Sequence, residues 1–109
     1  MFAVKWTIRA REDFDRLKAA AQGRRPSAKS SKQEGLYKQV SKTIRLLMSN
    51  PRHPGLQTHE FLSLANPFDP TGKVFEAYAQ NRTPGAYRVF WCYGPGRSEI
   101  TVVAVTAHP

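Results

Sequence analysis

The C-terminal part of the chain, GAYRVFWCYGPGRSEITVVAVTAHP at residues 85–109, is the feature that most restricts the fold. Residues 86–93 are rich in aromatic and β-branched side chains, which favour a half-buried pleated surface, and the GPG that follows predicts a hairpin turn. Residues 100–106 carry apolar side chains at odd and even positions alike, which indicates a strand that is covered on both faces. We therefore expect a hairpin of two strands, in which residues 100–106 form a central strand of the sheet.

The N-terminal segment predicts one strand and one helix. Residues 2–8 alternate between apolar and polar side chains, which is the period of a strand. After them, Phe14, Leu17 and Ala21 recur at helical spacing, and acidic residues occupy the early turns, where the helix dipole favours them. We expect this first helix to end near Gly23.

A second helix is predicted from a start signal and an apolar stripe. Ser31 and Glu34 form an S-x-x-E capping box, and Asn50-Pro51 provides a stop, so we expect a helix over residues 32–49. A short basic loop separates it from the first helix, which favours an antiparallel helical hairpin. Apolar residues recur along one face of this helix at Leu36, Val40, Ile44 and Leu47.

The remaining segments complete an α+β fold. Residues 61–64 predict a short strand, and residues 73–80 predict another, with turn-rich sequence around them. The expected order is β-α-α-β-β-β, with two helices packed on one face of a twisted, mainly antiparallel sheet of four to five strands. A length of 109 residues suits one domain, which we take as residues 1–109.

The charge of the chain is concentrated in its first half. Residues 1–60 hold 13 Lys and Arg against 5 Asp and Glu, whereas residues 61–109 hold 4 against 3, within a net charge of +9. Such a surface attracts RNA, DNA, the ribosome or an acidic protein partner. The lone cysteine, Cys92, fits a reducing cytosol, and no signal peptide or membrane-spanning run is expected, so we expect a cytoplasmic protein without a membrane partner.

Three local motifs, taken in order, resemble the RelE/ParE superfamily of bacterial toxin–antitoxin toxins. VKWTIRAREDFDRL at residues 4–17 is similar to the family's first strand and helix start, and SNPRHPGLQTHEF at residues 49–61 is similar to its Asn-Pro and Leu-x-x-His segment. GAYRVFWCYGPG and the final ITVVAVTAHP resemble its Gly-x-Tyr-Arg-Val strand and its last strand with histidine. The resemblance covers most of the chain except residues 23–31.

The resemblance implies one of two activities. RelE-like members cut mRNA in the ribosomal A site without a metal, and ParE-like members inhibit DNA gyrase. Both are usually neutralised by an antitoxin that covers the basic surface, so a cognate antitoxin is an expected partner. Our first expectation is a ribosome-dependent mRNA endoribonuclease acting by 2′-OH attack on phosphate. The alternative is a ParE-like gyrase inhibitor or a basic nucleic-acid-binding or protein-binding module without nuclease activity.

Metal-free RNA cleavage requires a stabilised phosphorane and a proton shuttle, and four residues are candidates for these tasks. Arg88 matches the family's mid-strand arginine and suits a phosphate clamp, or else it is paired with Glu76 across the sheet. Arg82 could supply a second cation. His108 could transfer protons, and Tyr93 could donate a proton or stack on a base.

A wider RNA-binding surface is expected around the second helix. Its candidate residues are Lys38, Lys42, Arg45, Arg52 and His53. His59 occupies the position of the family's Leu-x-x-His histidine and is expected to be structural there. The three histidines and Cys92 show no zinc-like spacing, and no nucleotide-cofactor motif is present, so we expect neither a metal nor a cofactor.

Overall fold

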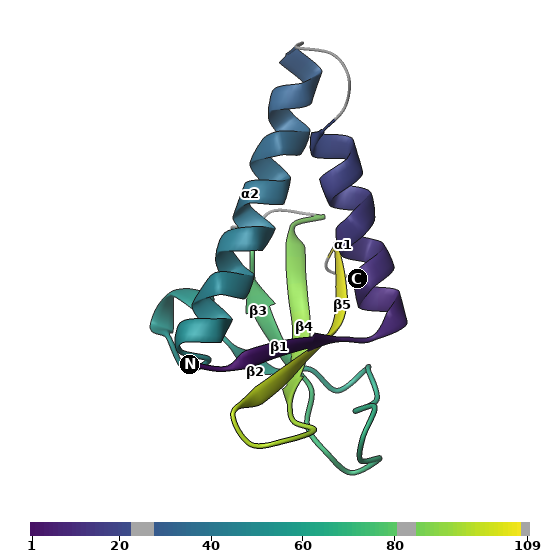
Figure 1. The fold of residues 1–109 in the computed structure, drawn as a ribbon, viewed down its shortest axis with the longest axis vertical. Coiled ribbons are helices and arrows are strands. Elements are labelled where there is room, and N and C mark those ends of the chain that lie inside the picture. Colours follow the sequence, from purple (N-terminus) through teal and green to yellow (C-terminus); the bar gives the residue numbers. More distant parts are fainter. Residues whose placement is uncertain (23–27, 81–84, 108–109) are drawn as a thin grey trace.

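The computed structural model describes residues 1–22, 28–80 and 85–107, which form two long helices and a mixed five-stranded sheet. The α+β class and the packing of both helices on one face, as expected from the sequence, are confirmed (Figure 1). The elements in chain order are β1 (Ala3–Trp6), α1 (Ile8–Ala21), α2 (Ala28–Ser49), the short 3-10 helix η1 (Pro54–Leu56), β2 (His59–Glu60), β3 (Phe75–Tyr78), β4 (Tyr87–Tyr93) and β5 (Glu99–Ala107).

The sheet has the strand order β1-β5-β4-β3-β2. β2, β3, β4 and β5 pair as an antiparallel meander, and β1 joins the far side of β5 in parallel, with Ala3 opposite Glu99 and Trp6 opposite Val102. β5 therefore lies inside the sheet, as its two apolar faces predicted. Its position between β1 and β4 explains why residues 100–105 are all buried.

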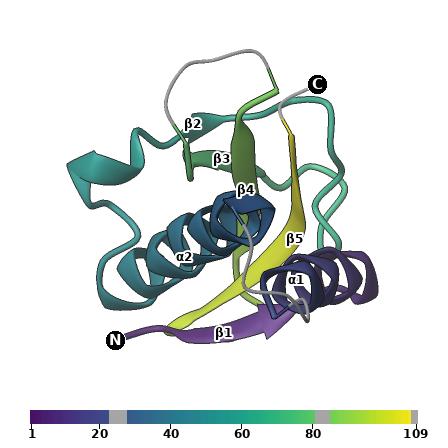
Figure 2. The ribbon, with the colours of Figure 1, turned by 90° about the horizontal axis from the view of Figure 1, so that it is seen from above.

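Both helices cover the same face of the sheet (Figure 2). The predicted stripe of α2 provides the helical half of this core, since Val40, Ile44 and Leu47 are buried there. Val89 and Trp91 of β4 meet it from the sheet side. The helical hairpin extends beyond the sheet along the long axis of the molecule, which measures 45 × 24 × 23 Å (Figure 1). Neither helix, over the residues described, is long and apolar enough to span a membrane.

The opposite face of the sheet has a smaller core that the segment after β2 covers. Phe90 and Cys92 of β4 pack there against Phe61 and Leu64. The β4–β5 register shifts beside Phe90, which pairs with Ala104 while Trp91 pairs with Val102. Val103 is thus the extra residue of a β-bulge, and the bulge places two successive β5 side chains, Val103 and Ala104, in this same core.

The start of α1 covers the edge of β5 that β1 leaves open. β1 ends at Trp6, and beyond it the Thr7 hydroxyl donates to the Val103 carbonyl at 2.9 Å. The Val105 amide donates to Asp13 Oδ2 at 3.0 Å. Thr7, which caps α1, and Asp13 of α1 therefore bind backbone groups of β5 that no neighbouring strand of the described structure pairs with. These bonds protect the edge of the sheet.

Three expected boundaries are wrong in detail. The first strand is shorter than residues 2–8, because Thr7 already caps α1 by accepting the Ala10 amide at 3.1 Å. Ser31 is not a helix cap: α2 begins at Ala28, and no Pro or Gly between Ala28 and Ser31 interrupts it. The short strand expected at residues 61–64 lies instead at His59–Glu60, where it pairs with Glu76 and Phe75.

Candidate functional site

Arg88 lies at the start of β4 on the face opposite the helices, and its side chain is only 4% exposed. Its Nε is 3.7 Å from Glu76 Oε2 on the neighbouring strand β3. Its Nη1 donates to the backbone carbonyls of Gln80 at 3.1 Å and Tyr87 at 3.0 Å. The sequence left two roles open for Arg88, a phosphate clamp or a pair with Glu76, and the structure has the ion pair with Glu76.

The ring of Tyr78 completes the packing around this guanidinium. Tyr78 lies directly opposite Arg88 in the β3–β4 register, and the guanidinium carbon is 3.7 Å from the centre of its ring. A cation over an aromatic face is attracted by the ring quadrupole, most strongly where water is absent. Arg88 is thus fixed by a carboxylate, two carbonyls and a ring.

His59 connects the buried Glu76 carboxylate to the surface. Its Nε2 is 2.5 Å from Glu76 Oε1, its Nδ1 is 3.1 Å from the Gln57 carbonyl, and its side chain is 50% exposed. A carbonyl oxygen only accepts, so Nδ1 must carry a hydrogen. A hydrogen bond between His59 Nε2 and Glu76 Oε1 requires a proton on one of these two atoms. We call His59, Glu76, Tyr78 and Arg88 the charged cluster; its histidine ring is half exposed.

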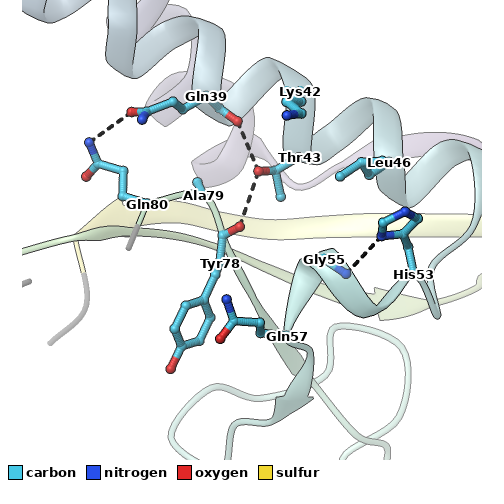
Figure 3. A pocket seen from close by; sticks show the side chains of 10 residues that line it. All are labelled: Gln39, Lys42, Thr43, Leu46, His53, Gly55, Gln57, Tyr78, Ala79 and Gln80. Carbon is cyan, nitrogen blue, oxygen red and sulfur yellow. Dashed lines mark hydrogen bonds between the residues drawn. The ribbon is translucent and has the colours of Figure 1, made fainter. Parts of the chain in front are cut away.

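A groove of about 510 Å³ lies beside the charged cluster, along the outer edge of β3 (Figure 3). β2 pairs with β3 only at Phe75 and Glu76, so the edge from Ala77 onward faces this groove. Gln39 and Lys42 line it from α2, and His53 lines it from the turn before η1. Figure 3 shows the Tyr78 ring beside Gln57 at the border of the groove, which places the cluster next to it.

The cations predicted on α2 form one exposed stripe. Lys38, Lys42 and Arg45 are all exposed and follow one another at i, i+4 and i+7, so they share a face of the helix. Lys42 is the member of the stripe that borders the groove of Figure 3. The stripe therefore leads from the helix surface to the charged cluster.

Tyr93 lies far from Arg88, at the other end of β4. Four residues of extended strand lie between the two, and the five steps from one to the other correspond to about 17 Å. Arg52, His53 and Tyr93 instead line a second groove of about 410 Å³, which we call the Tyr93 groove. His53 lines both grooves, and its Nδ1 accepts the Gly55 amide at 2.9 Å.

Two of the predicted site residues, Arg82 and His108, lie outside the residues that the structure describes. Among residues 1–22, 28–80 and 85–107, no three His, Cys, Asp or Glu side chains gather in a group that could hold a metal ion. Cys92 is buried in the smaller core, on the face of the sheet opposite the helices, and this burial raises the pKa of its thiol.

His59 and Glu76 are the functional candidates that sequence reasoning undervalued. The sequence assigned His59 a structural role and named Glu76 only as a partner for Arg88. Period two along β3 puts Glu76 and Tyr78 on one face, which was the available signal. That Glu76 lies opposite His59 depends on the β2–β3 register, which no local pattern reveals.

Comparisons with known proteins place the fold. The sequence matches no protein-family model and no curated protein. Among solved structures, it is similar to a YoeB/ParE toxin from Agrobacterium tumefaciens, with 13% identity, a TM-score of 0.60 and full coverage of both chains. It is also similar to the chromosomal ParDE toxin–antitoxin system of P. aeruginosa, with 14% identity, a TM-score of 0.57 and coverage of 100% of this chain and 98% of that one.

A copper-bound mutant toxin from Helicobacter pylori is similar as well, with 16% identity, a TM-score of 0.54 and coverage of 99% of this chain and 96% of that one. All three likenesses extend over nearly the whole of both chains, so they concern the complete architecture and not one shared motif. The chain has a RelE/ParE-like toxin fold, as its motifs suggested.

Proposed function

We propose that this chain is the toxin of a type II toxin–antitoxin module and that it cleaves mRNA on the ribosome without a metal. The fold supports the class of protein. The observation that carries the activity is the charged cluster: a half-exposed histidine, hydrogen bonded through Nε2 to a buried carboxylate, beside a groove that a lysine stripe approaches. This arrangement suits acid–base chemistry on a polyanion.

The proposed reaction uses the RNA's own nucleophile. The 2′-oxygen attacks the adjacent phosphorus and gives its proton to a solvent water, the bond from phosphorus to the 5′-oxygen breaks, and that oxygen takes up a proton from His59. His59 is the proposed proton donor to the leaving oxygen, because its ring is half exposed and a turn of the side chain would bring Nε2 from Glu76 Oε1 to the substrate. Exposed Lys42 and Arg52 are proposed to meet the phosphates, and Arg82 and His108 stay candidates for the site from the sequence alone.

Arg88 has a different task in this proposal from a phosphate clamp. Its side chain is buried and bound to Glu76, Gln80 and Tyr87, so it does not face a substrate. It acts as a positioning residue that keeps the Glu76 carboxylate oriented toward His59. Removing it would change the orientation of the carboxylate and of the imidazole that contacts it.

The proposed partners follow from the same surfaces. A ribosome supplies the mRNA, and the stripe Lys38, Lys42 and Arg45 suits contact with ribosomal or messenger phosphates. A cognate antitoxin with acidic side chains would compete for that stripe. Both interactions belong to the cytoplasm.

The proposal is tested with purified toxin, programmed ribosomes and mapping of the cut sites in the mRNA. The wild-type chain should leave a 2′,3′-cyclic phosphate on the upstream fragment, as 2′-OH attack requires. His59→Gln should slow single-turnover cleavage by about 10²- to 10⁴-fold, the range for loss of a general acid. Glu12→Gln, which changes an exposed carboxylate on α1, is the control and should cut at the wild-type rate. Intact mRNA with the folded wild-type chain would refute the activity, and wild-type cleavage by His59→Gln would refute the role of His59.

Burial of Arg88 also favours a second candidate, a ParE-like gyrase inhibitor or a binding module without nuclease activity. A guanidinium that is 4% exposed cannot clamp a phosphate directly, so the sheet lacks the cation that this chemistry would use there. A gyrase supercoiling assay separates the candidates. Supercoiling that persists at excess toxin would exclude gyrase inhibition. Loss of supercoiling, together with intact mRNA in the ribosome assay, would establish gyrase inhibition as the function.

A further inference from the structure

The Tyr93 groove has no part in the proposed proton transfer at His59. It lies between the turn at Arg52, the segment before β2, the start of β3 and the end of β4. Its volume is about 410 Å³. The lining residues that matter here are Arg52, Thr58, Phe75, Trp91 and Tyr93.

Two polar groups at this groove lack a hydrogen-bond partner. Trp91 is 1% exposed, and its indole Nε1–H finds no acceptor within the described ranges 1–22, 28–80 and 85–107. The buried Thr58 hydroxyl also lacks a hydrogen-bond partner within these described ranges. Buried donors are nearly always satisfied in folded proteins, by protein, water or ligand. Two such groups, one from the segment before β2 and one from β4, belong to residues that line one groove, and they indicate that the groove receives a molecule with an acceptor atom.

The rest of the lining defines the shape and charge of that molecule. Tyr93 is 45% exposed and stands edge-on to Trp91, with 4.9 Å between the ring centres. Phe75 lies 5.0 Å from Trp91 and 6.0 Å from Tyr93, so three rings meet at the groove. Arg52 adds an exposed cation at the rim. An aromatic surface, a cation and inward donors together suit a flat ring that carries a carbonyl and is attached to a phosphate.

We propose that the Tyr93 groove binds one unpaired nucleobase of the RNA, with its ring against Tyr93, a base carbonyl toward the Trp91 and Thr58 donors, and the adjoining phosphate at Arg52. This inference rests on the proposed function, because it names the part of the RNA that a second groove of the same toxin holds. Sequence-specific recognition of RNA commonly stacks splayed bases on aromatic side chains. Trp91 Nε1 and Thr58 Oγ1 are buried, so the proposed binding requires the exposed Tyr93 and Arg52 side chains to shift and admit the base.

The experiment measures binding through Trp91 fluorescence. The full chain carries Trp6→Phe, which leaves Trp91 as its one tryptophan, and is titrated with hexauridylate and with an abasic ribose-phosphate of the same length. Hexauridylate should quench the fluorescence to saturation, with an affinity at least about 10-fold above that of the abasic strand. Tyr93→Ala should weaken hexauridylate binding by roughly 10- to 100-fold, the usual effect of losing one stacked base. Phe68→Ala removes an exposed ring that does not line the groove and should bind as the parent does.

A second variant keeps the test decisive if Tyr93→Ala is poorly folded. Thr58→Val has nearly the same volume and removes only the hydroxyl, so it should reduce the preference for hexauridylate over the abasic strand about 3- to 10-fold. Equal binding of the two strands by the parent, or an unchanged preference in Thr58→Val, would mean that the donors hold only water, and the inference would be overturned. Base-dependent binding with intact ribosomal mRNA would refute the cleavage and leave this site standing. Cleavage without base-dependent binding would refute this site alone.

Discussion

Asp13 is predicted to be a principal attachment of α1 to the sheet, and its replacement tests how the edge of β5 is protected. The Asp13 side chain is 9% exposed, and Oδ2 accepts the backbone amide of Val105 at 3.0 Å. Asp13→Ala removes this acceptor and leaves the Val105 amide buried without a replacement. Because Val105 is itself buried, water cannot reach the amide at low cost.

The size of the effect follows from these contacts. A hydrogen bond to a charged group contributes about 1.5–3 kcal/mol, and leaving the buried partner unsatisfied costs about 1–3 kcal/mol. Asp13 also meets Arg9 at 3.8 Å and Arg16 at 2.6 Å, but both arginines are largely exposed, so solvent screening leaves each pair worth about 0.5 kcal/mol or less. We expect Asp13→Ala to lower the free energy of unfolding by about 2–3 kcal/mol.

Urea unfolding followed by circular dichroism measures this loss. With a denaturant slope of about 1–3 kcal/mol/M, the midpoint should fall by roughly 1–2 M while the slope stays unchanged. Asp13→Asn keeps an oxygen acceptor and should lose about 1 kcal/mol, since only the charge is removed. Asp15→Ala is the matched control, because Asp15 is exposed on the same helix and meets only the exposed Arg11. An Asp13→Ala midpoint equal to that of Asp15→Ala would refute the reasoning.

Three further predictions concern the cores and the charged cluster. Glu76→Ala leaves the Arg88 guanidinium buried without its carboxylate and should lower the free energy of unfolding by about 3–5 kcal/mol, whereas an effect below 1 kcal/mol in urea unfolding would contradict the ion pair. Leu47→Ala removes a fully buried side chain and should cost about 2–5 kcal/mol in the same assay, with a loss under 1 kcal/mol excluding its place in the core. Because burial raises the pKa of the Cys92 thiol, the unfolded chain loses this proton at a lower pH than the folded chain, so stability should fall as the pH rises above the ordinary thiol pKa. Cys92→Ala should remove that part of the pH dependence, and an unchanged pH profile would contradict it.

The elements that the sequence predicted well are those with a clear local period. The apolar stripe of α2 at Val40, Ile44 and Leu47 is buried as expected, because a 3.6-residue period identifies the buried face wherever the helix docks. β5 was identified as an interior strand for a similar reason. The start of α2 was wrong, since a capping box is only a possible helix start and nothing before Ser31 prevents the helix from beginning at Ala28.

The candidate site was only partly predictable. Arg88 was named as a site candidate, and its pairing with Glu76, which the structure has, was one of the two roles considered. Arg88 and Tyr93 were grouped as one site, yet the length of β4 holds them at opposite ends. Arg52 and Tyr93, which were given separate roles, share a groove because the turn after α2 folds against the end of β4.

The sequence by itself determined the types of element, the buried face of each one and the basic character of the surface. These depend on period, composition and charge, which are local properties that a chain carries into any fold. Only the tertiary structure decided which polar groups meet, namely His59 with Glu76 and Asp13 with the Val105 amide, and that Thr58 and Trp91 line one groove. These contacts depend on strand register and on helix docking, where a shift of one residue exchanges the two faces of a strand.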